Sequence, residues 1–243
     1  MRRSILITGA SGGIGAETAR FFGRKGWVVG LTVRRKDRLQ EVAQDIENAV
    51  VLPADLTDAA QAEAAVEGFA REAGRLDVLF NNAGIFTPAA PIDEVSLDNW
   101  HRAIDINLNA MFYCARAAFH QMRAQTPQGG RIINNGSISA HTPRPGSVTY
   151  TVTKHAVTGL TKTIALDGRP FDIACGQIDI GNARTDLLQG IIDRALEAGE
   201  APPPTMAVED VARAVWNMAD LPLEANVLNM TIMATKMEHV GRG

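Results

Sequence analysis

The 243-residue chain lacks the sequence features of disulfide-rich, metal-binding and secreted proteins. Its two cysteines, Cys114 and Cys175, fit neither a disulfide framework nor metal-ligand spacing, so we expect them to be reduced core residues. The five histidines show no metal spacing either, and no metal site is predicted. The apolar run at the N-terminus stops at Thr8-Gly9, which is too short for a signal peptide and fits a first strand. We therefore expect a cytoplasmic protein.

Charge and hydrophobicity exclude two further kinds of partner. The formal net charge is -3, so no basic surplus exists to neutralise phosphates, and a nucleic-acid partner is not expected. No apolar run approaches the roughly 20 residues that cross a bilayer, so no membrane partner is expected. A chain with 46% hydrophobic and 21% charged residues is ordinary for a globular protein with a sizeable core.

Apolar runs of strand length alternate with helical patterns along most of the chain. The predicted strands are Ile5–Thr8, Trp27–Val33, Ala49–Pro53, Val78–Asn81, Arg131–Asn135, Ile173–Ile178 and Val227–Ile232. The predicted helices are Ile14–Lys25, Asp37–Glu47, Asp58–Glu72, Leu97–Arg123, Thr151–Leu166 and Val208–Ala219. Continuous apolar strands separated by helices indicate a parallel sheet covered on both faces. Because no linker divides the chain, we predict one α/β domain over residues 1–243, a doubly wound seven-stranded parallel sheet of the Rossmann type.

One segment breaks this alternation. Residues Asn182–Met206 follow the sixth strand and contain three consecutive prolines, Pro202-Pro203-Pro204. A long insertion at this point is typical of a mobile lid, so residues 182–206 are predicted to cover a substrate. The alternative is a passive surface loop.

A glycine-rich turn follows the first strand directly. It reads from Thr8 to Gly15 as T-G-A-S-G-G-I-G, and a helical stretch begins at once. Glycines let the backbone turn tightly and approach a pyrophosphate, whose charge then meets the positive end of the helix. The position between strand and helix favours a dinucleotide site over a simple tight turn.

A second group of residues points to proton transfer. Tyr150 and Lys154 are four residues apart at the start of a predicted helix, so their side chains share one face. A neighbouring ammonium favours the phenolate, so Lys154 is expected to lower the pKa of Tyr150. Ser137 closes the fifth strand at its carboxyl end, where doubly wound sheets bind ligands, and its hydroxyl could hold a substrate oxygen.

With these motifs in order, the chain resembles the short-chain dehydrogenase/reductase family over nearly its whole length. The resemblance implies a catalytic tetrad, in which Ser137 is preferred to Ser139 because it stands thirteen residues before the tyrosine: Asn107, Ser137, Tyr150 and Lys154. It also implies a set of cofactor contacts from the glycine turn and the ends of later strands: Gly9, Ser11, Gly13, Ile14, Gly15, Asp55, Leu56, Asn82, Ala83, Gly84, Tyr150, Lys154, Gly181 and Thr185.

The family resemblance also implies a role for each member of the tetrad. Tyr150 would exchange the proton with the substrate oxygen, and Ser137 would hydrogen-bond that oxygen. Lys154 would hold the nicotinamide ribose, and Asn107 would hold a water that links Lys154 to solvent. The chain departs from the family where Ile180-Gly181 replaces the usual Pro-Gly, although Thr185 is retained.

The end of the second strand bears on the choice of cofactor. An NAD site places an acid there, about 20 residues after the glycine turn. The strand Trp27–Val33 ends without an acid, and Arg34 and Arg35 follow it. Asp37 lies beyond the strand, and with Gln40 three residues later it is interpreted as a helix capping box. A guanidinium suits a 2′-phosphate, so NADP(H) is favoured, with NAD(H) as the alternative.

We therefore predict an oxidoreductase that moves a hydride between NADP(H) and a secondary alcohol, ketone or small hydroxy acid. One alternative is a cofactor-binding regulatory protein with this fold and little turnover; another is a sugar-nucleotide epimerase, for which the chain leaves little room. The helix Leu97–Arg123 carries an apolar face, which in this family commonly pairs subunits, so a homodimer or homotetramer is expected. The alternative is that this face packs in the core of the subunit. His141 lies between Ser137 and Tyr150 and could touch substrate, whereas His155 is interpreted as a surface or structural residue.

Overall fold

The computed structural model describes residues 2–239, apart from the side chains at positions 187, 191 and 194. Its seven strands are β1 (Ser4–Thr8), β2 (Val28–Val33), β3 (Ala49–Pro53), β4 (Val78–Asn81), β5 (Gly130–Asn135), β6 (Ile173–Ile180) and β7 (Asn229–Ile232). All neighbours pair in parallel, in the order β3-β2-β1-β4-β5-β6-β7. The predicted doubly wound sheet is confirmed. Its strand order reverses between β1 and β4, where such sheets open a crevice at the carboxyl ends of the strands.

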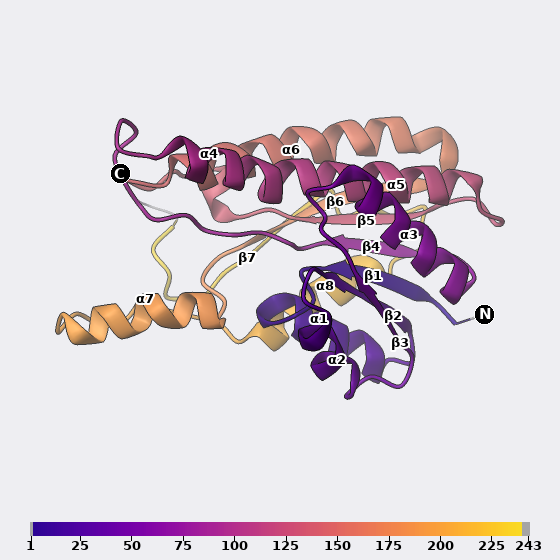
Figure 1. Ribbon diagram of the computed structural model, residues 1–243, viewed down its shortest axis with the longest axis horizontal. Coiled ribbons are helices and arrows are strands. Elements are labelled where there is room, and N and C mark those ends of the chain that lie inside the picture. Colours follow the sequence, from indigo (N-terminus) through magenta and orange to yellow (C-terminus); the bar gives the residue numbers. More distant parts are fainter. Residues whose placement is uncertain (1, 240–243) are drawn as a thin grey trace.

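Helices cover both faces of this sheet (Figure 1). One face packs against α1 (Gly13–Arg24), α2 (Lys36–Ala43) and α8 (Val208–Ala219). The other packs against α3 (Ala59–Ala73), α5 (Ala110–Ala124) and α6 (Val148–Gly168), with α4 (Leu97–Ile104) preceding α5 along the same layer. A separate apolar core therefore lies on each side of the sheet. Among the described residues, no helix is both long and apolar enough to cross a membrane.

Aromatic packing fixes the layer of α1 and α8. The rings of Phe22, Trp27 and Trp216 lie with centroids 5.0 to 5.5 Å apart in tilted and edge-to-face contacts. Such pairs add to the stabilisation that burial itself provides. They hold α1, whose N-terminus follows the glycine-rich turn, firmly against the sheet.

Three local features differ from the sequence-based expectation. The predicted helix Leu97–Arg123 is interrupted by a π-helix at Asp105–Asn109. The segment 182–206 contains an unexpected helix, α7 (Asp186–Glu197), which extends away from the two layers (Figure 1). The interpretation of Asp37 and Gln40 as a capping box is wrong, because α2 begins earlier, its N-cap is Arg35, and no side chain caps it.

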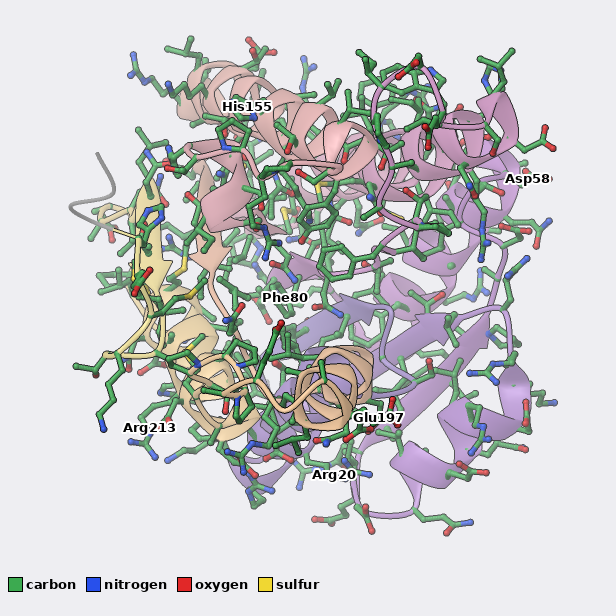
Figure 2. The ribbon with its side chains drawn as sticks, turned by 90° about the vertical axis from the view of Figure 1, so that its left-hand side faces the viewer. Arg20, Asp58, Phe80, His155, Glu197 and Arg213 are labelled. Atoms are coloured by element: carbon green, nitrogen blue, oxygen red, sulfur yellow. The ribbon has the colours of Figure 1, made fainter. Side chains whose placement is uncertain are left out.

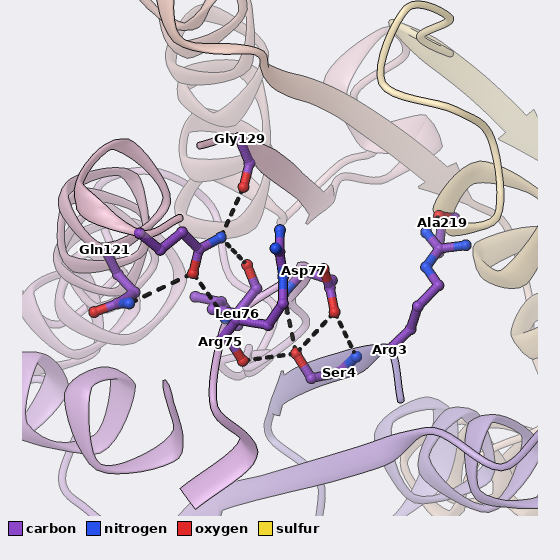
Figure 3. Close-up of polar contacts among 9 residues, drawn as sticks. Arg3, Ser4, Arg75, Leu76, Asp77, Gln121, Gly129 and Ala219 are labelled. Carbon is purple, nitrogen blue, oxygen red and sulfur yellow. Dashed lines mark hydrogen bonds and ion pairs between the residues drawn. The ribbon is translucent and has the colours of Figure 1, made fainter. Parts of the chain in front are cut away.

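A polar network closes the amino-terminal edge of the sheet (Figure 3). The hydroxyl of Ser4 donates to the Arg75 carbonyl at 2.8 Å, and its backbone N–H donates to Asp77 Oδ2 at 2.8 Å. The side chain of Gln125 donates to the carbonyls of Leu76 and Gly129 at 2.9 and 2.7 Å. These bonds satisfy loop backbone groups far from the carboxyl edge, so their role is structural.

Candidate active site

The glycine-rich turn has the close packing that requires glycine. Gly9 and Gly13 have φ angles of 67° and 51°, in the left-handed region. A Cβ on Gly9 would lie 2.9 Å from the Cα of Ala83, and a Cβ on Gly15 would collide with the Gly9 carbonyl. The turn is therefore pressed against the end of β4 and leaves no room for side chains at these positions.

The N-terminus of α1 is open at the end of this turn. Its N-cap, Gly12, provides no side-chain hydrogen bond, and the first helical turn contains no acid. A Cβ built on Gly12 meets nothing within 4 Å. No side chain of the N-cap therefore bonds the first amides of α1, which leaves them and the positive end of the helix dipole available to an anion.

The predicted Asn82-Ala83-Gly84 segment joins the turn to β4. The backbone N–H groups of Asn82 and Ala83 both donate to the Thr8 hydroxyl at 2.9 Å. The Asn82 amide donates to the Thr8 carbonyl at 3.0 Å. The carboxyl ends of β1 and β4 are thus held together at the switch point of the sheet.

Ser137, Tyr150 and Lys154 come together at the same edge. Ser137 follows β5 and caps a short 3-10 turn, Ile138–Ala140, while Tyr150 and Lys154 lie at the start of α6. The Lys154 ammonium is fully buried, donates to the Asn135 carbonyl at 2.7 Å and lies 5.4 Å from the centre of the Tyr150 ring. The ring of Phe86 stacks on Tyr150 with centroids 4.2 Å apart.

Burial acts in opposite directions on the two titratable groups. It raises the pKa of the Tyr150 phenol, and a hydrogen bond with Ser137 and the charge of Arg144 only partly oppose it. It lowers the pKa of Lys154 to about 8, with the charge of Asp179 opposing. The expected lowering of the Tyr150 pKa by Lys154 is therefore not found in the protein alone, where desolvation and the charge of Asp179 raise that pKa.

Asn107 lies on the π-helix, which turns its side chain toward this cluster. Its amide accepts from the Ile85 N–H at 2.7 Å and donates to the Ile85 carbonyl at 3.0 Å. A Cβ on Gly84 would lie 3.4 Å from Asn107 Oδ1 and 4.0 Å from Lys154 Nζ, so the two side chains border the same space. Single π-turns of this kind often occur at functional sites.

The residues predicted to bind the adenosine end lie together at the ends of β2 and β3. Arg34 Nη1 is 3.9 Å from Asp55 Oδ2, and both side chains are partly or largely exposed. Asp55 Oδ1 also accepts from the hydroxyl of Thr57 at 2.7 Å, while Leu56 is buried beside it. Arg35 is exposed at the start of α2.

The predicted lid begins beside the glycine-rich turn. The side chain of Thr185 lies 3.1 Å from the position of a Cβ on Gly13, and Gly181 is bonded to β7 through its N–H. The Met206 N–H donates to the Asn182 carbonyl at 2.9 Å, which brings the two ends of the segment together. Ser11 and Ile14 complete the turn at this side.

A family model described as short chain dehydrogenase matches residues 3–195. The chain belongs to this family. The sulfoacetaldehyde reductase 2 of Chromohalobacter salexigens is 29% identical over 96% of this chain and 94% of its own. The closed form of a serine dehydrogenase with NADP+ has a TM-score of 0.89, at 27% identity and over 99% and 98% of the two chains. A 3-ketoacyl-(acyl-carrier-protein) reductase from Brucella melitensis with NADH has a TM-score of 0.85, at 25% identity and over 96% and 97%.

This short-chain dehydrogenase carries a polar residue in its site that the sequence reading missed. Asp179 lies in β6, within the apolar stretch Ile178-Asp179-Ile180, and its side chain is 1% exposed. Its Oδ1 accepts from the Ser137 N–H at 2.8 Å, and its Oδ2 is 2.8 Å from Nε2 of His141. An acid inside an otherwise apolar strand was the available signal, because a buried carboxylate needs partners.

The other histidine considered from the sequence lies elsewhere. His155 is exposed on the outer side of α6, where its Nδ1 is 2.8 Å from the Thr151 carbonyl (Figure 2). Among the residues that the structure describes, no group of histidine, cysteine and acidic side chains could hold a metal ion.

Proposed function

We propose that this short-chain dehydrogenase transfers a hydride between NADP(H) and an alcohol or carbonyl substrate, with Tyr150 as the acid/base. The observation that carries the proposal is the meeting of Tyr150, Ser137 and Lys154 beside the open N-terminus of α1. The names of two relatives, a sulfoacetaldehyde reductase and a serine dehydrogenase, support chemistry between a carbonyl and an alcohol.

The residues present suit a nicotinamide dinucleotide. The uncapped amides of α1 would bind the pyrophosphate, and the glycines leave room for its approach. The pair of Asp55 and Arg34 would border the adenosine, and Thr185 lies beside the turn near the opposite end. The cofactor would supply or accept the hydride, and the protein supplies position and electrostatics.

The side chains of the tetrad would carry out the proton transfer to or from the substrate oxygen. In reduction, the neutral Tyr150 phenol would donate its proton to the carbonyl oxygen, which the Ser137 hydroxyl would hold by a hydrogen bond. Lys154 would hold the ribose hydroxyls, with its buried ammonium steadied by the Asn135 carbonyl. Asn107, on the π-helix, would hold a water between Lys154 and solvent.

We propose NADP(H) as the preferred cofactor. Arg34 is the first residue beyond β2, and no acid stands at the end of that strand to accept from the ribose hydroxyls of NAD. A phosphate would replace the distant Asp55 carboxylate as the partner of Arg34. Solved relatives contain NADP+ in one case and NADH in another, so NAD(H) is the alternative.

The segment 182–206 is proposed as the substrate lid, because its ends meet beside the site while α7 extends outward (Figure 1). A homodimer or homotetramer in the cytoplasm is proposed as the working form. The exposed apolar side chains Phe112, Val152 and Leu166 on α5 and α6 support pairing of subunits through that layer.

The experiment that tests this function is an assay of alcohols and ketones with NADPH, NADH and their oxidised forms, followed at the nicotinamide absorbance band. We expect turnover with at least one substrate class and a higher kcat/KM with the phosphorylated cofactor. Tight cofactor binding without turnover across the panel would instead favour a regulatory protein. The retention of all four tetrad residues argues against that alternative.

A further inference from the structure

Ser137 lies just beyond the sheet, where the backbone pairing of the strands ends. Strands β5 and β6 pair as far as Asn135 and Ile178, and the Gly136 N–H still donates to the Ile178 carbonyl at 2.9 Å. The next N–H, that of Ser137, donates to a side chain of β6, Asp179 Oδ1, at 2.8 Å. The carboxylate of Asp179 thus ties the main chain at Ser137 to the sheet.

This carboxylate is itself held in place by other groups. Asp179 is fully buried, and Gln177 donates to the same oxygen, Oδ1, at 2.7 Å. Oδ2 lies 2.8 Å from Nε2 of His141, which carries a proton in this contact because a carboxylate only accepts. A Cβ on Gly136 would collide with Oδ1, so the glycine leaves the space that the acid fills. Donors on both oxygens make the carboxylate a fixed point to which the Ser137 N–H is attached.

The hydroxyl of Ser137 is positioned through this attachment. Its oxygen accepts from the Ser139 N–H at 3.1 Å, so it belongs to the short turn Ile138–Ala140, which begins at the backbone that Asp179 holds. A hydrogen bond between the Ser137 side chain and the Tyr150 phenol opposes the rise that burial causes in the pKa of that phenol. In an active site, a displacement of about 1 Å can cost about 10²-fold in rate, so the place of this hydroxyl matters.

The charge of Asp179 offers a second way for it to act. The carboxylate raises the pKa of Tyr150 and opposes the lowering of the Lys154 pKa by burial. Position and charge can be separated by an amide, which keeps an acceptor oxygen in the same place and loses the charge. At pH 6 the Lys154 amine stays charged, because its pKa is about 8. Assays at this pH therefore report on position.

We infer that Asp179 is a positioning residue for Ser137: it binds the backbone N–H and thereby holds the hydroxyl where it meets the substrate oxygen. The inference rests on the proposed function, in which that hydroxyl bonds the substrate oxygen. Gln177 and His141 act one step further away, because they fix the two oxygens of the carboxylate. Since Asp179 acts through Ser137, its removal should matter only while the Ser137 hydroxyl is present.

A double-mutant cycle tests this dependence directly. Asp179→Ala should lower kcat about 10- to 100-fold at pH 6 and leave the dissociation constant of NADP(H) nearly unchanged. In the Ser137→Ala background the same substitution should lower kcat by less than about twofold, because the group that it misplaces is already absent. An equal loss in both backgrounds, or no loss in the wild-type background, would overturn the inference. If Asp179→Ala does not fold, Gln177→Met replaces it in the cycle, with a smaller expected loss and the same criteria.

Two matched variants separate position from charge and from general stability. Asp179→Asn keeps an acceptor for the Ser137 N–H and should retain kcat within about fivefold of the wild type at pH 6. Asp77→Ala removes an acid that accepts from the Ser4 backbone N–H at the same distance of 2.8 Å, but at the amino-terminal edge of the sheet (Figure 3). It should lower stability in urea and leave kcat unchanged. A kcat in Asp179→Asn as low as in Asp179→Ala would assign the effect to charge and overturn the inference.

Hydrogen exchange gives a readout that needs no turnover. The Ser137 amide should exchange at least about 10-fold faster in Asp179→Ala than in the wild type, because its acceptor is gone. The Gly136 amide, bonded to the Ile178 carbonyl, should change much less and is the internal control in the same NMR measurement. Unchanged exchange at Ser137 would overturn the inference while the proposed function stands. A wild type that turns over no alcohol or ketone would instead remove the proposed function, and the assigned role of Asp179 with it, even where the exchange at Ser137 responds.

Discussion

Tyr150 and Lys154 show how one environment prepares two groups for different tasks. Burial keeps the phenol protonated at neutral pH, which suits a proton donor in carbonyl reduction. The same burial makes the amine less basic, with a pKa of about 8, so its charge is retained below that pH. The chemistry therefore depends on desolvation as much as on the contact between the two side chains.

The first prediction concerns the phenol. Tyr150→Phe removes the only proton donor of the proposed mechanism and should lower kcat by about 10²- to 10⁴-fold while the dissociation constant of NADP(H) stays nearly unchanged. Tyr113→Phe alters the only other tyrosine, on α5, and should leave kcat unaffected. Steady-state kinetics and cofactor titration measure both. Comparable kcat in Tyr150→Phe and the wild type would exclude the assigned role.

A second prediction concerns cofactor choice. Replacing Arg34 and Arg35 together by alanine should weaken NADP(H) by about 10- to 150-fold and leave NAD(H) nearly unchanged, because a charge-assisted bond to phosphate is lost. Val33→Asp should go further by repelling the phosphate. Arg38→Ala removes an exposed cation that pairs with Glu41 and serves as the control. A wild type that already binds NAD(H) more tightly would show the assignment to be wrong.

Lys154 gives a third prediction, in stability. Its pKa falls from 10.5 to about 8 on folding, so the unfolded chain binds more protons between these values and wild-type stability rises with pH there. Lys154→Met should therefore be more stable than the wild type at pH 7, by about 1–3 kcal/mol, although turnover is lost. The gain should shrink as pH rises from 8 toward 10.5. Urea unfolding at both pH values tests this, and a variant less stable at pH 7 would contradict it.

Among the elements, α7 differs most from the rest of the fold. It joins two ends that meet at Asn182 and Met206, and it projects from the layers instead of packing within them (Figure 1). A helix attached by its ends can swing while its attachment points stay in place. Since Thr185 lies at one end and touches the glycine-rich turn, movement of α7 is linked to the cofactor side of the site.

The fourth prediction follows from this attachment. Amides of Asp186–Glu197 should exchange with deuterium readily in the free protein and more slowly with NADP+ and a substrate bound, because closure would bury them. Helix α8, packed in the core beside α1, should show no such change. Exchange in α7 that is identical in the two states would indicate a passive surface segment instead of a lid.

The elements also show where a sequence permits prediction and where it does not. Both ends of strand β3 were predicted correctly, because the apolar run that forms it is bordered by residues typical of turns, which mark where the strand begins and ends. The π-helix at Asp105–Asn109 does not alter the apolar periodicity of the predicted helix, so it could not be predicted. Asn107, which lies in it, was identified only because it matches a motif of the family. Helix α7 was missed although its apolar residues have helical spacing, because the three prolines at 202–204 that follow it were taken as the sign of a loop. Asp179 was missed because the residues around it form a regular apolar strand pattern. Its partners, His141 and Ser137, are 38 and 42 positions away in the sequence, so a local pattern does not indicate them.

On the scale of the whole molecule, the amino-terminal and carboxyl ends of the strands form two edges of the sheet with different roles. The amino-terminal edge is closed by the bonds of Ser4, Asp77 and Gln125, whereas the carboxyl edge bears the candidate site (Figure 3). The layer of α4, α5 and α6 leaves large apolar side chains exposed on its outer surface. That layer is where we expect a second copy of the chain to pack.

The fifth prediction tests this assembly. Phe112→Glu, at an exposed position on α5, should shift the chain from an oligomer toward the monomer, because a carboxylate would be buried without a partner. Leu196→Glu makes the same change at an exposed leucine of α7 and should leave the oligomer intact. Light scattering after size-exclusion chromatography gives the mass of each. A wild type that elutes as a monomer would refute the prediction.

The contact between Gly136 and Asp179 has a consequence for related sequences. Any side chain at position 136 would occupy the place of the Asp179 carboxylate, so the residues that one of these positions accepts depend on the residue at the other. In related sequences of this fold we therefore expect an acid at the position of Asp179 to occur together with glycine at the position of Gly136.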